Sequence, residues 1–530
     1  MNYEKSPRAS AFKLPKTYLD EVSTTRDSGW VAGLLGHPVI NGPTCYREVV
    51  LTSSNNDYEE MDMTDDLYAF LSALVRFKEE IEDRIPEYFS CHHLNLFQTE
   101  TAELSHYFAA IATVLGINIR PVSAMEDLNP IEEVLHYRLM ALHSENITSD
   151  SDAEQIVRTF LNEYNRIKCE QLAQAQQAIE ALRKKTISLP QNLNLNYYVG
   201  GAGENTIVIV NAFGQSLDYW TMLIANLVKS HRVIIWLPRG NEDFRGGSFQ
   251  ANPMTVHVED IKTMLRHEEV DACDFVGWCT GPKLMIEFQA KYPEYVSSMT
   301  FLCPTFKSIP GKQNLESPFE SNLDPLLRMV DNMPRLAKPL SSSLQSTLLA
   351  PKAHVSSVAV HDPRARKQTA DMLSFVHGSL RSLIVEPFAT EQSVVNYAKQ
   401  LVTFWAGDVS PMLEKIDVPV VFVGGEYDGI ASPQLAKIMF QQIRGAKYLE
   451  IKGGSHYLQY EDSELITHII NRFLNEKWTL NFGHPLVNQT SSTADFSGQA
   501  TIPLKSEIAV GRGQYHPAIA GGSPSLSAVS

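Results

Sequence analysis

The chain has 530 residues, of which 44 % are hydrophobic, and this is enough for two folded units with cores of their own. Its formal net charge of −16 argues against nucleic acid or an anionic membrane as the main partner, because both attract basic surfaces. The six cysteines lack C-x-x-C spacing, and neither a signal peptide nor a long apolar stretch is visible, so we expect a cytoplasmic protein without a disulfide framework or membrane span.

Residues 1–190 are predicted to form an all-helical N-terminal module. Its first 60 residues or so show no clear period, but apolar residues then recur at helical spacing in several stretches. These stretches lie at about 64–86, 99–116, 130–143 and 152–185. We place the end of the module at Pro190, where the helical pattern stops.

Residues 191–480 show the pattern of a doubly wound, mostly parallel α/β sheet, because short apolar runs alternate with helical stretches. The expected strands are 192–199, 206–210, 233–236, 274–276, 299–302, 418–423 and 447–451. Between about 305 and 405 the strand pattern lapses, and we expect a helical lid inserted there. Residues 481–530 are rich in Ser, Gly, Thr and Pro, which predicts a flexible C-terminal tail.

The strongest chemical signal is the motif G-x-C-x-G around Cys279, which follows a predicted strand and opens a predicted helix. In such a sharp turn the flanking Gly277 and Gly281 are needed, because side chains there would collide with the neighbouring strand and helix. A helix N-terminus also favours a thiolate. Cys279 is therefore the candidate nucleophile, and the adjacent Trp278 is a candidate substrate-binding or packing residue.

An acid and a histidine follow two later strands. Asp428 ends the run Gly-Gly-Glu-Tyr-Asp after the strand at 418–423, and His456 ends Gly-Gly-Ser-His after the next strand. His456 would deprotonate Cys279, and Asp428 would fix the imidazole tautomer and stabilise its cation. Glu426 and Asp408 are the alternative acids.

A turn of small residues ends the strand at 206–210 and is the place for an oxyanion hole. The backbone N–H groups of Phe213, in this turn, and Thr280, next to the nucleophile, are the expected donors. Gln215, in the same turn, is a candidate substrate-binding residue.

The order of nucleophile, acid and histidine resembles the α/β-hydrolase superfamily from Thr206 to Phe473, about half of the chain. The elements that carry the resemblance are LPRGNED, GWCTG, GGEYDGIASP and GGSHYLQYED. A cysteine nucleophile behind a long N-terminal extension resembles the aminoacyl shuttle transferases of nonribosomal peptide assembly lines, of the syringomycin and coronamic acid type. It also resembles polyhydroxyalkanoate synthases, although these usually carry a further glycine where this chain has Pro282.

The resemblance implies an acyltransferase of natural-product (antibiotic) biosynthesis. Its partner would be an acyl or peptidyl carrier protein, whose phosphopantetheine thioester would load Cys279 for passage to a second acceptor. A cysteine suits this role, because exchange between thioesters is close to isoenergetic. The alternatives are a thioesterase or cyclising enzyme, a polymerase like the polyhydroxyalkanoate synthases, and a catalytically silent scaffold.

No cofactor is expected. The pairs Glu103/His106 and Glu133/His136 have the Glu-x-x-His spacing found in di-iron helix bundles. No second pair of bridging carboxylates accompanies them in the sequence, so we expect no metal site.

Overall fold

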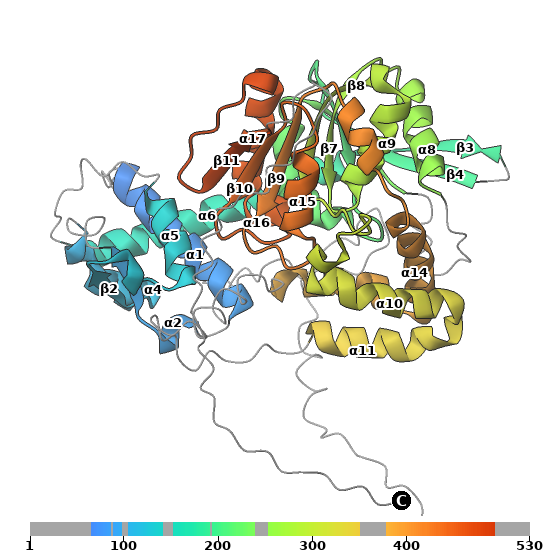
Figure 1. Ribbon diagram of the computed structural model, residues 1–530. Helices are drawn as coiled ribbons and strands as arrows, with labels where there is room; N and C mark the ends of the chain where they lie inside the picture. Colours follow the sequence, from blue (N-terminus) through green and yellow to red (C-terminus); the bar gives the residue numbers. More distant parts are fainter. Residues whose placement is uncertain are drawn as a thin grey trace, which may run out of the picture.

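The structure is a computed structural model (Figure 1), and it describes residues 65–85, 88–97, 104–140, 152–190, 193–238, 253–349 and 378–492. The first part of the predicted module, the middle of the predicted lid and the end of the predicted tail therefore lie outside the described residues. Within the described ranges, no helix is long and apolar enough to cross a membrane.

The N-terminal module is mainly helical and has a hydrophobic core of its own. Its helices are α1 (Asp65–Arg84), α2 (Tyr88–Cys91), α4 (Phe108–Leu115), α5 (Pro130–Leu139) and α6 (Ala153–Glu180). Good caps explain two of the helix starts, since Asn129 forms a capping box with Glu132 and the Asp152 side chain accepts a hydrogen bond from the N–H of Gln155. The module differs from the all-helical expectation in one respect: strands β1 (Leu94–Phe97) and β2 (Ile119–Val122) form a small parallel sheet.

The second unit is built around a nine-stranded sheet in the order β11-β10-β9-β8-β7-β5-β6-β4-β3. The strands are β3 (Arg183–Leu189), β4 (Leu193–Gly200), β5 (Thr206–Val210), β6 (Arg232–Trp236), β7 (Cys273–Trp278), β8 (Val296–Leu302), β9 (Val420–Gly425), β10 (Lys447–Ile451) and β11 (Val487–Ser491). Neighbours from β6 to β10 run parallel, and β3, β4 and β11 pair antiparallel at the two edges. This confirms the predicted mostly parallel, doubly wound sheet.

Helices cover both faces of this sheet (Figure 1), and each face has its own core. On one face lie α8 (Met254–His267), α9 (Gly281–Lys291) and α15 (Pro433–Phe440). On the other lie α7 (Thr221–Leu227), α16 (Leu458–Glu461) and α17 (Ser463–Glu476). Because the inner strands are covered on both sides, they are continuous apolar runs such as the buried TIVIV of β5.

The limits of the sheet differ from the expected limits of the second unit. Strand β3 begins at Arg183, before the predicted boundary at 190, and β11 lies inside the predicted tail. Both are polar edge strands, and β3 alternates between exposed and half-buried residues. Such strands lack the apolar run that identified the inner strands, which explains the difference.

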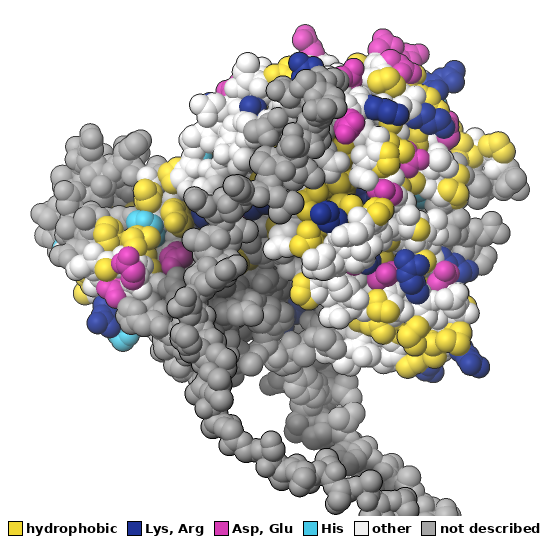
Figure 2. All heavy atoms as spheres, in the orientation of Figure 1, with side chains coloured by type: hydrophobic (Ala, Val, Ile, Leu, Met, Phe, Trp, Pro, Cys, Tyr) yellow, Lys and Arg dark blue, Asp and Glu magenta, His cyan; other side chains and the backbone are white. Residues whose placement is uncertain are grey.

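The predicted lid region contains α10 (Pro318–Asn332), α11 (Ala337–Leu349), α13 (Arg381–Val385) and α14 (Glu391–Trp405). Helices α10 and α11 lie together below the sheet in Figure 1, and α14 packs against both. Figure 2 shows hydrophobic side chains gathered over this region, where Met329 and Met333 are exposed.

Candidate active site

Cys279 lies in the turn between β7 and α9 and has a φ of +55°, a conformation that side chains other than glycine rarely adopt. Two hydrogen bonds to the end of β8 hold this turn. The N–H of Cys279 donates to the carbonyl of Leu302 (3.0 Å), and its carbonyl accepts from the N–H of Thr305 (2.9 Å). The strained turn projects the thiol at the carboxyl edge of the sheet, where it is partly exposed.

The flanking glycines are required by close packing. A Cβ at Gly281 would lie 2.3 Å from the carbonyl oxygen of Val210 in β5, and one at Gly277 would lie 2.2 Å from the Met285 sulfur in α9. This confirms the reason given for glycine at both positions, because a side chain at either one would collide with a neighbouring strand or helix.

His456 and Asp428 meet beside the turn. His456 Nδ1 lies 2.8 Å from Asp428 Oδ2, and both side chains are almost fully buried. The other oxygen of Asp428 accepts the backbone N–H groups of Ile430 and Ala431, each at 2.9 Å. The carboxylate is thereby oriented toward the imidazole, as a tautomer-fixing acid must be.

The two alternative acids lie elsewhere. Glu426 accepts the N–H of Gly453 at 3.0 Å, and Asp408 accepts from Ser410 in an exposed turn. The structure therefore brings Asp428, of the three carboxylates considered, to the histidine.

Cys279 also lies close enough to the His456 ring to affect the charge of the site. Burial favours the neutral ring, but the charge of Asp428 and the nearby Cys279 outweigh it and raise the pKa of His456 to about 10. The arrangement can hold an imidazolium at neutral pH between the carboxylate of Asp428 and the sulfur of Cys279.

The two predicted oxyanion residues lie against each other. The backbone N–H of Phe213 donates to the side-chain Oγ1 of Thr280 at 3.0 Å, and both residues are buried. The Phe213 N–H, expected to bind an oxyanion, thus donates to the Thr280 hydroxyl instead. The roles of both residues stay predictions.

Trp278 and Gln215 also lie at this edge of the sheet. Trp278 is 1 % exposed, and its indole N–H donates to the carbonyl of His456 at 2.9 Å, so it supports the histidine from behind. The Gln215 side chain hydrogen-bonds to the phenol of Tyr397. A role of either residue in substrate binding stays a prediction.

Two tyrosines near the thiol were missed by the sequence analysis. Burial raises the pKa of the phenols of Tyr397 and Tyr457, and the nearby Cys279 raises both further. Tyr397 comes from α14 and packs so closely on Gly214 that a Cβ there would lie 2.7 Å from its ring. No local motif marks a residue of the lid, whereas Tyr457 directly follows His456 and could have been considered.

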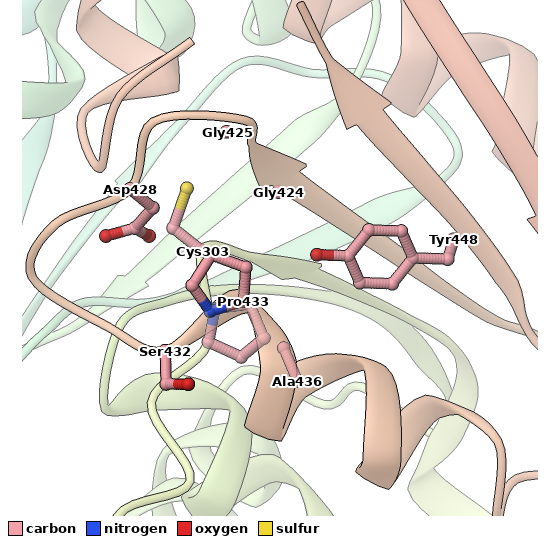
Figure 3. Close-up of a pocket in the computed structure, with 9 residues that line it drawn as sticks. Cys303, Gly424, Gly425, Asp428, Ser432, Pro433, Ala436 and Tyr448 are labelled. Carbon is pink, nitrogen blue, oxygen red and sulfur yellow. The ribbon is translucent and has the colours of Figure 1, made fainter. Parts of the chain in front are cut away.

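Cys303 lies behind the acid, at the end of β8. Its Sγ donates to the carbonyl of Ser455 at 3.5 Å, and Figure 3 shows the thiol beside Asp428 in a small pocket that Tyr448 also lines. Among the described residues, Cys303, Asp428 and His456 are the one group of three side chains with metal-binding atoms close together. Two of its members already pair with each other at 2.8 Å, so this cluster belongs to the acid–histidine pair.

Residues 205–463 match the family model described as alpha/beta hydrolase fold. A curated relative, the pyrrolizixenacetamide deacetylase of Xenorhabdus hominickii, is 23 % identical over 285 residues, which are 53 % of this chain and 94 % of that protein.

Solved structures of low identity are similar as well. A thermophilic esterase from Thermogutta terrifontis has a TM-score of 0.42 at 17 % identity and covers 56 % of this chain and 100 % of its own. A bromoperoxidase from Bacillus anthracis has a TM-score of 0.43 at 17 % identity, with coverages of 55 % and 100 %. The family match and the strand order show that residues 205–463 have the α/β-hydrolase fold.

Proposed function

We propose that this protein is a cysteine-dependent acyltransferase. It takes an acyl or aminoacyl group from the phosphopantetheine thioester of a carrier protein onto Cys279 and passes it to a second acceptor, a thiol, in natural-product biosynthesis. The observation that carries the proposal is the placement of Cys279, in its strained turn, near His456, whose ring pairs with Asp428.

The chemistry runs in two balanced halves. The Cys279 thiolate attacks the thioester carbonyl, a tetrahedral oxyanion forms, and the carrier thiolate leaves and takes the proton held by His456. The acceptor thiol then gives its proton to His456 and attacks the acyl-Cys279 carbonyl, and Cys279 leaves as the thiolate. Asp428 keeps the protonated ring oriented in both halves.

Two features support a cysteine in this role. The raised pKa of His456 favours an imidazolium, which can give its proton to the carrier thiolate as that group leaves. A thioester at Cys279 also lies close in free energy to the thioesters of donor and acceptor, so the group can move onward instead of accumulating. A silent scaffold would not require the contact between Cys279 and His456.

Intact-protein mass spectrometry after incubation with acyl-carrier thioesters tests the proposal. The wild type should gain the mass of the acyl group, and Cys279→Ala should not. Cys273→Ala is the matched control, because Cys273 is a buried cysteine at the start of β7 and lies outside the site. Acyl mass on the Cys279→Ala variant would show that the nucleophile is another residue.

A hydrolase that releases the acyl group to water is the second candidate. It is favoured by the relative named as a deacetylase, which matches 53 % of this chain. Free acid formed without an acceptor thiol, at a rate equal to that of loading, would favour this candidate over the transferase.

A further inference from the structure

The backbone next to His456 is held by a carboxylate on the following helix. His456 lies in the loop between β10 and α16, and Glu461 at the end of α16 reaches back to this loop. One oxygen of Glu461 accepts the N–H of Ser455 at 2.9 Å, and the other accepts the Ser455 hydroxyl. Glu461 therefore fixes the residue that directly precedes the histidine.

The counter-charge of Glu461 comes from the N-terminal module. Nη2 of Arg84, at the end of α1, lies 2.7 Å from Glu461 Oε1, and the two side chains are only 4 % and 7 % exposed. A charge pair buried to this degree is coupled, because removing one partner leaves the other charged group without compensation in a poorly solvated place. The position of Glu461 thus depends on a residue outside the α/β-hydrolase domain.

Further contacts bring the module to the same loop. Val134 of α5 packs on Gly453, where a Cβ would lie 2.3 Å from the Val134 side chain. A crevice at the junction is lined by Arg84, Val134, Gly453 and Glu461 among others. In Figure 1 the module lies beside β10 and α16, at the edge of the sheet that carries the histidine loop.

We propose that the N-terminal module contributes a positioning residue, Arg84, to the active site. Arg84 holds His456 in place through Glu461 and Ser455. This inference rests on the proposed role of His456 as the partner of Cys279. Each link is a charge-assisted hydrogen bond, and such bonds fix position more strongly than neutral ones. Reactive geometry is sensitive to such support, because a shift of about 1 Å at a reacting group can cost ~100-fold in rate.

Alkylation of Cys279 by iodoacetamide, followed across pH in the full chain by peptide mass spectrometry, tests this inference without a known substrate. The alkylation rate reports the thiolate that His456 stabilises. Arg84→Met should slow alkylation at neutral pH ~10- to 100-fold and alter the pH profile, because His456 is displaced from the thiol. Arg84→Lys keeps a cation beside Glu461 and should recover most of the rate.

Arg76→Met is the matched control. Arg76 also joins the module to this segment, through the Glu461 carbonyl (3.1 Å) and the Asp462 carboxylate (2.9 Å), but it does not touch the Glu461 carboxylate. This variant should keep the wild-type alkylation profile. If Arg76→Met and Arg84→Met slow alkylation equally, the effect comes from docking of the whole module and the inference is wrong. A wild-type alkylation profile in Arg84→Met would also contradict the inference.

Arg84→Met with Glu461→Gln guards against a folding defect. This double variant leaves neither group of the pair charged, so it should fold even if the single variant does not. Cys279 of the double variant should still be alkylated slowly, because a single amide oxygen replaces the two carboxylate oxygens that hold Ser455. Alkylation of the folded double variant at the wild-type rate would contradict the inference. The proposed function is checked separately by the wild type: if its Cys279 reacts no faster than an ordinary exposed thiol, the pairing with His456 is itself wrong.

Discussion

The protonation of His456 links the geometry of the site to the reactivity of Cys279. With a pKa of about 10, the ring carries its proton throughout the neutral range and loses it only as the pH approaches that value. Since the ring is buried, the charge exists because of Asp428 and Cys279 and not because of solvent. The charge of Asp428 is therefore necessary for a protonated His456 ring at neutral pH.

Asp428→Asn is expected to remove this support. The amide keeps the shape of the acid but not its charge, while burial continues to favour the neutral ring, so the pKa of His456 should fall. Alkylation of Cys279 at neutral pH should slow by ~100-fold or more, the order of an acid–base contribution. An unchanged rate would contradict the role of Asp428.

The same variant has a signature in stability. A histidine whose pKa is raised from 6.5 to about 10 contributes stability that is fully present below pH 6.5 and is lost as the pH rises through about 10. The difference in melting temperature between wild type and Asp428→Asn should therefore be largest in mildly acidic solution and shrink toward pH 10. A difference that grows with pH would have the wrong sign.

The Thr280 hydroxyl is expected to stabilise the oxyanion directly. It accepts the Phe213 N–H at 3.0 Å, so its own proton is free to point to a substrate and is polarised by that bond. Thr280→Val keeps the shape and should slow acylation by thioesters ~100-fold, as expected for the loss of one oxyanion donor, while alkylation, which forms no oxyanion, should be unaffected. Thr280→Ser should resemble the wild type. Faster acylation in Thr280→Val would mean that the hydroxyl blocks the amide instead.

The junction of β7 and α9 offers a comparison between its two glycines. A methyl group at Gly281 meets a backbone carbonyl of β5, which cannot move without breaking the sheet, whereas one at Gly277 meets the mobile end of Met285. Gly281→Ala should therefore lower the free energy of unfolding by more than Gly277→Ala does. The loss in Gly281→Ala should reach or exceed the ~1–3 kcal/mol typical of overpacked cores. Denaturant unfolding measures both, and equal losses would show that the Met285 side chain cannot yield.

The sequence predicted the inner elements far better than the edges. The strand expected at 206–210 is β5, a continuous apolar run because both of its faces are covered, and the strand expected at 447–451 is β10. Strand β3, by contrast, has the sequence RKKTISL, which continues the charged pattern of the preceding helix. Its extended form is imposed by pairing with β4, and this information is not local.

At the scale of the whole molecule, some contacts join segments that are far apart in the sequence and that no sequence motif identifies. The proximity of Cys279, Asp428 and His456 was predictable, because each residue follows a strand whose carboxyl end lies at one edge of the sheet. Arg84 and Glu461 are 377 positions apart and carry no signature of pairing. Because the N-terminal module contacts the histidine loop, removing it should disturb reaction with small thioesters as well as with carrier-bound ones.

Transfer and hydrolysis differ in what a serine at position 279 would do. Cys279→Ser places a nucleophile of similar shape beside His456 and leaves Phe213 and Thr280 unchanged. In a transferase the serine form should load slowly and then stall as an oxyester or release acid. Transfer from this oxyester to a thiol acceptor is uphill in free energy, because it converts an ester into a thioester. Mass spectrometry and thiol-acceptor assays should show transfer reduced much more than loading. In a hydrolase, serine should support turnover at a rate comparable to or higher than that of the wild type. Release of free acid by Cys279→Ser at the wild-type rate would therefore show that the protein is a hydrolase and not a transferase.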